Sequence, residues 1–261
     1  MNNTPVIKRF FEYLPSIIKF HKLKSEGLAR FIFLAVLISQ LVGNFIQYTL
    51  LNKVSSEDIE LIISAIVMPT SVPEGTSITG AMLQPLFLVL GTTLIVKLVV
   101  NLLLSVYMYS YIAELKGKAA GFAASFKGAF RHLGRLIVYN ILFGLLVLLG
   151  LMFFVVPGIL AYIIFIFGFC YILDLKLTLA DAFTASSDIT RGRKALIFNV
   201  LAGFYIMFEL PIILLISGSS LGSAYLASFF STISSMILQR LITQIYMDLE
   251  YRKEGSIKPQ A

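Results

Sequence analysis

Long apolar runs constrain this chain more than any other feature of its sequence. Stretches near the 20 or so residues that cross a bilayer core recur along the 261 residues, separated by polar connections. Only 13% of the residues are charged, whereas about 25% is usual for a soluble domain. Such a chain would expose too much apolar surface in water. The sequence therefore predicts an all-α integral membrane protein.

The apolar runs predict six transmembrane helices. A leader at 1–28 precedes the membrane domain at 29–249, and a tail at 250–261 follows it. Between the third and fourth runs lies Pro157-Gly158, where we expect a structural turn because Pro cannot continue a helix and Gly permits reversal. The fourth run is short, so five spans with a half-depth hairpin also fit. The six expected spans are 29–51, 85–113, 136–156, 159–173, 195–217 and 224–249.

The positive side chains predict the orientation, because lysine and arginine favour the cytoplasmic side of a membrane. Eighteen of the 21 lie on one side of the membrane, 17 of them in the leader, the tail and two connections and Arg30 at the very start of the first span. Lys53 lies on the opposite side, and Lys97 and Arg240 lie within spans. We therefore expect both termini in the cytoplasm. This distribution accounts for the net charge of +7 without a nucleic acid partner.

A basic amphipathic segment precedes each odd-numbered span. Before the third span, Phe122, Phe126 and Phe130 share one helical face and cations line the other. Before the fifth, Thr178 and Asp181 resemble a capping box. The sequence predicts three hairpins, each preceded by a cytoplasmic helix that lies in the membrane interface or packs on the ends of the spans. Anionic headgroups of membrane lipids are the expected partners. The side chains expected to contact them are Lys127, Arg131, Arg135, Arg191 and Arg193.

Polar side chains within the spans form the candidate binding site, since a charge in the bilayer centre costs about 2.5–3.5 kcal/mol. The run at 85–113 is longer than one crossing requires, and if the crossing begins near Leu90, Lys97 and Glu209 lie at similar predicted depth and could pair. A crossing that begins at Pro85 would place Lys97 deeper and weaken the pair. Such a pair would be a structural clamp, which we favour, or part of a substrate or proton path. Interhelical hydrogen bonding is the other interpretation of the amides that would extend this site. These amides are Asn101, Asn140 and Asn199.

Patterns typical of catalysis and metal binding are missing from the sequence. The two histidines, His21 and His132, have no carboxylate clusters near them, and Cys170 is the single cysteine. The chain has no P-loop, no nucleophile elbow and no zinc-protease motif. We therefore expect no enzymatic activity, no cofactor and no metal.

An ordered set of motifs resembles a bacterial membrane family. The set is VVPGI at 155–159, AFTASS at 182–187, TRG at 190–192 and QIYMD at 244–248. Over residues 105–255 it resembles YciC-type proteins and the membrane domain of glycerophosphoryl diester phosphodiesterases. The phosphodiesterase domain that accompanies this region in some relatives is not in the sequence. The resemblance implies a multi-pass fold in the bacterial cytoplasmic membrane and little about activity.

These features predict a non-enzymatic multi-pass protein of the cytoplasmic membrane, acting in envelope or membrane-lipid homeostasis or as a scaffold. The alternative is a small transporter or permease that uses Lys97 and Glu209. A membrane-embedded lipid enzyme is a third class, and the sequence offers no catalytic residues for it. The sequence leaves the oligomeric state and any protein partner open.

Overall fold

The structure is a computed structural model that describes residues 7–51, 80–118, 120–216 and 221–251. Lys53 and most of the predicted tail lie outside the described residues. The helices are α1 (Phe10–Ile17), α2 (Glu26–Leu51), α4 (Gly80–Leu115), α5 (Phe122–Phe130), α6 (Leu133–Phe153), α7 (Val155–Phe165), α8 (Gly168–Asp174), α9 (Leu179–Thr190), α10 (Lys194–Phe204), a π-helical turn (Tyr205–Glu209), α11 (Leu210–Ile216) and α12 (Leu221–Glu250).

Six segments of the described chain are long and apolar enough to cross a membrane, which confirms the predicted number. The fourth, made of α7 and α8, has 20 residues, or about 30 Å at 1.5 Å per residue. Its length therefore favours six spans over five. The segments are Gly27–Leu50, Leu83–Leu115, Leu133–Phe153, Val155–Asp174, Lys194–Leu214 and Gly222–Glu250.

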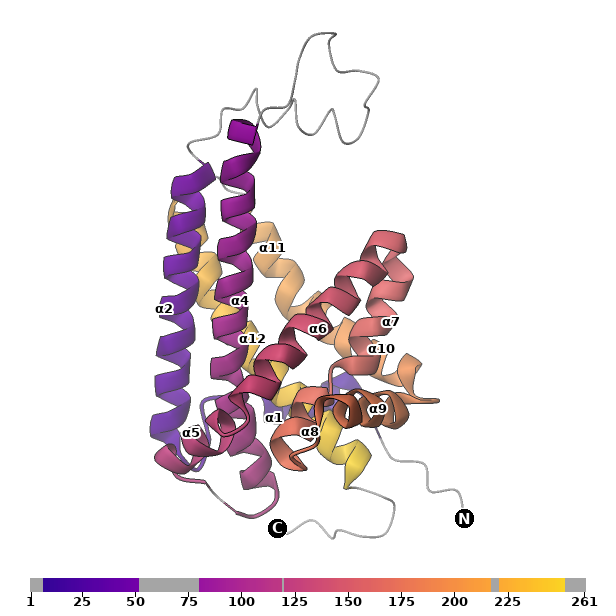
Figure 1. Ribbon diagram of the computed structural model, residues 1–261. Coiled ribbons are helices and arrows are strands. Elements are labelled where there is room, and N and C mark those ends of the chain that lie inside the picture. The colour runs from indigo at the N-terminus through magenta and orange to yellow at the C-terminus, as the bar shows by residue number, and fades with distance from the viewer. Residues whose placement is uncertain (1–6, 52–79, 119, 217–220, 252–261) are drawn as a thin grey trace.

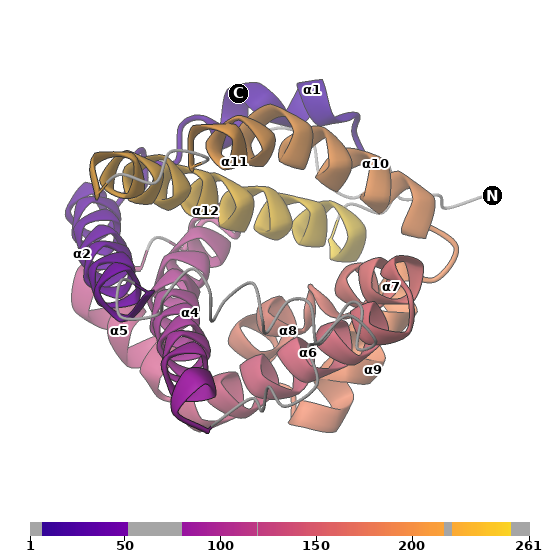
Figure 2. The same cartoon turned by 90° about the horizontal axis from the view of Figure 1, so that it is seen from above.

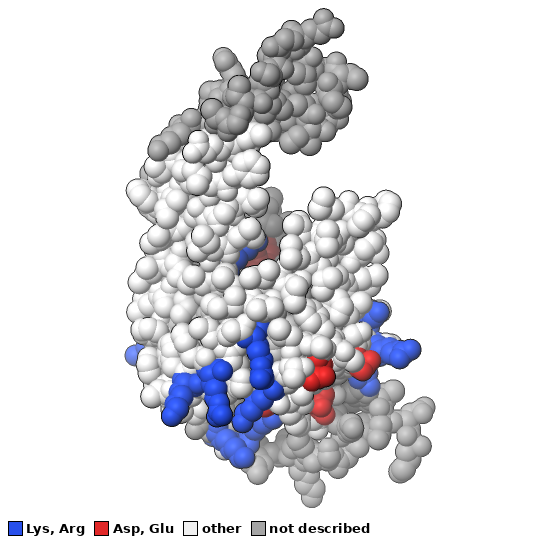
Figure 3. All heavy atoms as spheres, viewed as in Figure 1, with Lys and Arg blue, Asp and Glu red and all other residues white. Residues whose placement is uncertain are grey.

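The helix α12 packs against α2, α4 and α11. Figure 1 shows α2 and α4 side by side as the tallest pair, with α6 and α7 leaning beside them. Seen from above, α2 and α4 lie on one side and α6 and α7 on the other, and α12 runs along α11 (Figure 2). The short helices gather at the lower end, where Figure 3 also shows most of the lysine and arginine on this face. We call this end the basic end.

The least apolar span is also the most buried one. In α12, 56% of the most apolar window is buried, against 6% in α4. Apolar side chains gain little by leaving lipid, whereas serine, threonine and glutamine gain hydrogen bonds by facing other helices. The polar composition of α12 therefore favours its place among the other spans.

Short helices occur where the sequence predicts segments before the odd-numbered spans, at α1, α5 and α9. The predicted cap of α9 is present, because the hydroxyl of Thr178 accepts a hydrogen bond from the Asp181 amide at 3.3 Å. Their placement in a membrane interface stays a prediction.

The chain reverses between the third and fourth spans at Phe154, and not at Pro157-Gly158 as predicted. Phe154 is extended, with φ −161° and ψ 155°, and it separates α6 from α7. Pro157 lies in the first turn of α7, where an amide hydrogen would have no helical partner. Gly158 serves packing instead, because a Cβ on Gly150 of α6 would lie 2.7 Å from its Cα. The two glycines thus allow α6 and α7 to approach closely.

Candidate functional site

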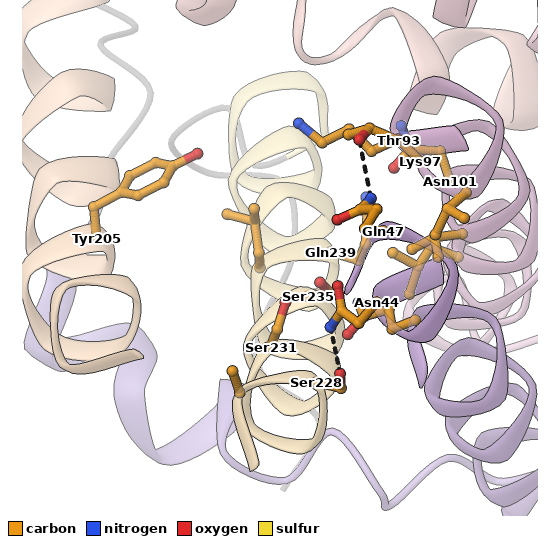
Figure 4. Close-up of a pocket in the computed structure, with 16 residues that line it drawn as sticks. Asn44, Gln47, Thr93, Lys97, Asn101, Tyr205, Ser228, Ser231, Ser235 and Gln239 are labelled. Carbon is orange, nitrogen blue, oxygen red and sulfur yellow. Dashed lines mark hydrogen bonds between the residues drawn. The ribbon is translucent and has the colours of Figure 1, made fainter. Parts of the chain in front are cut away.

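A polar cavity of about 490 Å³ lies between α2, α4 and α12. Figure 4 shows its polar lining, with Tyr205 of the π-helical turn facing the cavity from the opposite side. We call it the Lys97 cavity. The polar side chains that line it are Gln40, Asn44 and Gln47 of α2, Thr93, Lys97 and Asn101 of α4, and Ser228, Ser231, Ser235 and Gln239 of α12.

Helical periodicity brings these side chains together. Residues three or four apart share one face of a helix. On α2 the spacing of Gln40, Asn44 and Gln47 is four and then three. The polar positions on α4 and α12 also recur at intervals of three or four. Each of the three helices therefore presents a polar stripe to the other two.

Hydrogen bonds hold the stripes in register. The amide of Asn44 donates to Ser228 Oγ at 2.5 Å, and the amide of Gln47 donates to Thr93 Oγ1 at 2.9 Å (Figure 4). The hydroxyl of Thr232 donates to the side-chain amide oxygen of Gln40 at 3.1 Å. Interhelical hydrogen bonds of this kind help transmembrane helices to associate. These hydrogen bonds fix the walls of the cavity, and none of them involves the amine of Lys97.

Lys97 is the charged group of the cavity. It lies near the middle of α4, 18 residues or about 27 Å from Leu115 along the helix axis. Its side chain is exposed, and Figure 4 shows it extending into the space that Tyr205 faces. Its amine forms no hydrogen bond or ion pair with any described residue. The amine is therefore available to an anion.

The second cation that the sequence places deep within a span, Arg240, is already partnered. Arg240 is buried, and its guanidinium donates to the Lys22 carbonyl at 3.2 Å and to the Tyr107 hydroxyl at 3.3 Å. The guanidinium also lies 4.2 Å from the centre of the Tyr111 ring. These contacts explain Arg240 as a structural cation. No similar set surrounds Lys97 among the described residues.

Glu209 does not form the ion pair that the sequence allows with Lys97. The carboxylate ends the π-helical turn and accepts a hydrogen bond from Ser234 of α12 at 2.5 Å. Both side chains are described, and no ion pair joins them. Figure 3 shows a positive and a negative group within a recess at mid-height of the molecule. The structural clamp that the sequence allows between Lys97 and Glu209 is therefore not present as an ion pair between these described residues.

The three predicted asparagines separate in the structure. Asn101 lines the Lys97 cavity. Asn140 lies on α6 away from it, and its buried amide nitrogen has no hydrogen-bond partner among the described residues. Asn199 is exposed on α10. The structure therefore brings only Lys97 and Asn101 of the five predicted residues to this cavity, and it adds the neutral stripes of α2 and α12.

A second polar cluster joins the spans at the basic end. The carboxylate of Asp174 accepts hydrogen bonds from Lys116, from Tyr246 at 2.9 Å and from Tyr251 at 2.6 Å. Burial lowers the pKa of the Lys116 amine, but its contacts with Asp174 and Tyr251 outweigh this effect and raise the pKa above its usual value. The cluster ties the ends of α4, α8 and α12 together.

The cations predicted to contact lipid headgroups lie around the basic end, and they differ in their partners. Arg135 donates to the carbonyl of Lys176 at 2.9 Å, and Arg193 donates to the carbonyl of Ile189 at 3.3 Å. The side chains that remain exposed without a hydrogen bond to the described part of the chain are Lys127, Arg131 and Arg191.

Within the described residues, no group of three or more His, Cys, Asp or Glu side chains is placed to hold a metal ion. The fold and the cavity define a multi-pass helical membrane protein with a polar, cationic space among three of its spans. Comparison with protein families, curated proteins and solved structures finds no match for this chain.

Proposed function

We propose that this chain is a non-enzymatic protein of membrane-lipid homeostasis and that the Lys97 cavity binds the anionic headgroup of a membrane lipid. The observation that supports the proposal is the unpaired amine of Lys97 in a cavity of about 490 Å³. An unpaired cation at membrane depth costs about 2.5–3.5 kcal/mol. A phosphate group would offset this cost through charge-assisted hydrogen bonds.

The neutral stripes suit the rest of a headgroup. Asn44, Asn101, Ser231, Ser235 and Gln239 offer both donors and acceptors around the amine. The side-chain oxygen of Gln239 is buried without a hydrogen-bond partner in the described part of the chain, so a ligand hydroxyl or a water would satisfy it. A polyol phosphate combines the anion and the hydroxyls that this lining favours.

The proposal includes an orientation. The basic end lies in the cytoplasm, the termini are cytoplasmic, and the membrane is the bacterial cytoplasmic membrane. The positive-inside rule supports this orientation. The short helices at that end lie in the headgroup layer, where Lys127, Arg131 and Arg191 are exposed and each nearby cation contributes about 1 kcal/mol of attraction to anionic lipid. The resemblance to YciC-type proteins agrees with this setting.

A permease for a small anionic solute is the second candidate function. It is favoured by the π-helical turn beside the cavity, because such turns are frequent at functional sites and change the register of a helix. In this case the Lys97 cavity would bind a free anion, and Tyr205 would lie on the path. The two functions share the anion and differ in whether an acyl chain is attached to it.

Replacing Lys97 by methionine is expected to weaken binding of an anionic headgroup at least about tenfold, since a charge-assisted hydrogen bond contributes about 1.5–3 kcal/mol. The measurement is calorimetric titration of the detergent-solubilised protein with dihexanoyl phosphatidylglycerol. Lys97→Arg should retain most of the affinity because it retains the cation. Lys19→Met, which removes an exposed cation of the leader, is the matched control and should bind like the unaltered chain.

Equal affinities of the unaltered chain and Lys97→Met would contradict the proposal. Inorganic phosphate distinguishes the two candidate functions. Binding of free phosphate as tight as that of the lipid, together with Lys97-dependent phosphate uptake into proteoliposomes, would favour the permease.

A further inference from the structure

An apolar groove of about 370 Å³ lies between α6, α7 and α10. Its walls are aliphatic and aromatic, and none of its lining residues is charged. Ala202 contributes no large side chain on the α10 wall, which leaves room beside α7. The groove has the chemistry of a hydrocarbon site, in contrast to the polar lining of the Lys97 cavity.

The groove and the Lys97 cavity share a wall. Tyr205 lines both spaces, and its hydroxyl donates to the hydroxyl of Tyr162 at 3.2 Å. Tyr162 lines the groove and also a smaller cavity of about 140 Å³ that has Asn101 and Gln239 in common with the Lys97 cavity. A polar space and an apolar space therefore meet at a pair of tyrosine hydroxyls.

We propose that the groove holds an acyl chain of the same anionic lipid whose headgroup lies in the Lys97 cavity. This inference rests on the proposed function and names its ligand class, an anionic amphiphile. The lipid lies across Tyr205, with its phosphate near Lys97 and one chain between α7 and α10. Charge complementarity selects the headgroup, and the apolar lining beyond Tyr205 accepts the chain.

The groove positions the chain more than it adds affinity. Bilayer lipid is as apolar as the groove, so moving a chain between them provides little hydrophobic free energy. Selection therefore comes from the charge at Lys97, and the location of the chain follows from it. An experiment that reports location is consequently sharper than one that reports affinity alone.

The test uses a phosphatidylglycerol with a diazirine at the end of one acyl chain, at low abundance in phosphatidylcholine nanodiscs that contain the full chain. After illumination, peptide mass spectrometry maps the labelled residues. We expect label concentrated at 158–163 and 198–206, the stretches of α7 and α10 that line the groove. Label spread evenly over exposed apolar faces such as Leu34 and Ile38 of α2 would overturn the inference.

Two variants separate this inference from the proposed function. Ala202→Phe fills the groove and should abolish the groove label. Ile213→Phe alters an exposed position outside both spaces and should keep the label. Lys97→Met should reduce the groove label to that of a matched phosphatidylcholine probe.

The outcomes of the two experiments are distinct. Loss of dihexanoyl binding in Lys97→Met, with label absent from the groove of the unaltered chain, overturns only the acyl-chain site. Unchanged binding and unchanged labelling in Lys97→Met overturn the proposed function and this inference together. The mapping on the unaltered chain is decisive even if Ala202→Phe fails to fold.

Discussion

Replacing Asp174 by alanine is expected to lower the free energy of unfolding by about 3 kcal/mol, because each hydrogen bond to a charged group contributes about 1.5–3 kcal/mol. The carboxylate is almost fully buried, with 5% of its side chain exposed. It accepts hydrogen bonds from Lys116, which follows the end of α4, and from Tyr246 and Tyr251, which lie at the end of α12. Partial hydration of Lys116 keeps the loss below the sum of the separate bonds.

Unfolding of the purified protein by sodium dodecyl sulfate in mixed micelles measures this change. Asp188→Ala is the control, because Asp188 is exposed on α9 and its loss should alter stability by no more than about 0.5 kcal/mol. Asp174→Asn should fall between the two, since the amide oxygen still accepts hydrogen bonds and the charge is lost. Equal stability of Asp174→Ala and Asp188→Ala would show that the cluster does not hold the basic end together.

Replacing Tyr139 by alanine should cost about 3 kcal/mol or more, as is usual for a buried aromatic ring. Tyr139 is fully buried. Its ring stacks on Phe183 of α9 at 4.4 Å and meets Phe169 of α8 edge-on at 4.8 Å. Its hydroxyl donates to the carbonyl of Phe165 at 2.5 Å. The residue therefore anchors α6 to α8 and α9.

Thermal unfolding in detergent measures the loss, and two variants show its origin. Tyr139→Phe removes only the hydroxyl and should cost about 1 kcal/mol. Phe153→Ala removes a ring that is 75% exposed at the end of α6, so its melting temperature should match that of the unaltered chain. A Tyr139→Ala protein as stable as Phe153→Ala would contradict the aromatic anchor.

The spans could be predicted from the sequence because membrane thickness sets their length. Every predicted span overlaps a helix that is long and apolar enough to cross. The position of the turn between the third and fourth spans was predicted less accurately. Pro157-Gly158 is a typical turn pair, yet proline is equally suited to the first turn of a helix, and only the packing of Gly158 on Gly150 distinguishes the two roles.

The candidate site was only partly predictable, because rare residue types are easier to notice than common ones. Lys97 and Asn101 are unusual within an apolar helix. A single serine or glutamine in a transmembrane helix is not unusual, because a hydroxyl such as that of Ser228 can donate to the carbonyl four residues earlier. The serines and glutamines of α2 and α12 therefore do not stand out individually. Their recurrence at three or four residues on two helices was the available signal.

The relation of Lys97 to Glu209 shows a second limit. Depth along a span was estimated from the sequence, but the direction of a side chain around its helix also depends on neighbouring helices. The π-helical turn at Tyr205–Glu209 inserts a residue and rotates the side chains beyond it around the helix axis. No sequence pattern predicted this turn. In the structure Glu209 contacts Ser234 instead of Lys97.

The most direct test of this account is the reactivity of a thiol placed inside the Lys97 cavity. Cys170 is the chain's single cysteine, so Cys170→Ala provides a background for Ser231→Cys in the cavity and Leu226→Cys on the lipid-exposed face of α12. Charged methanethiosulfonates are applied to protein in nanodiscs, and the rates of labelling are compared. We expect Ser231→Cys to react faster than Leu226→Cys, and faster with the anionic reagent than with the cationic one. Adding Lys97→Met should remove this preference for the anion. Ser231→Cys that labels no faster than Leu226→Cys, with no preference for charge, would contradict a water-accessible, anion-attracting cavity within the membrane.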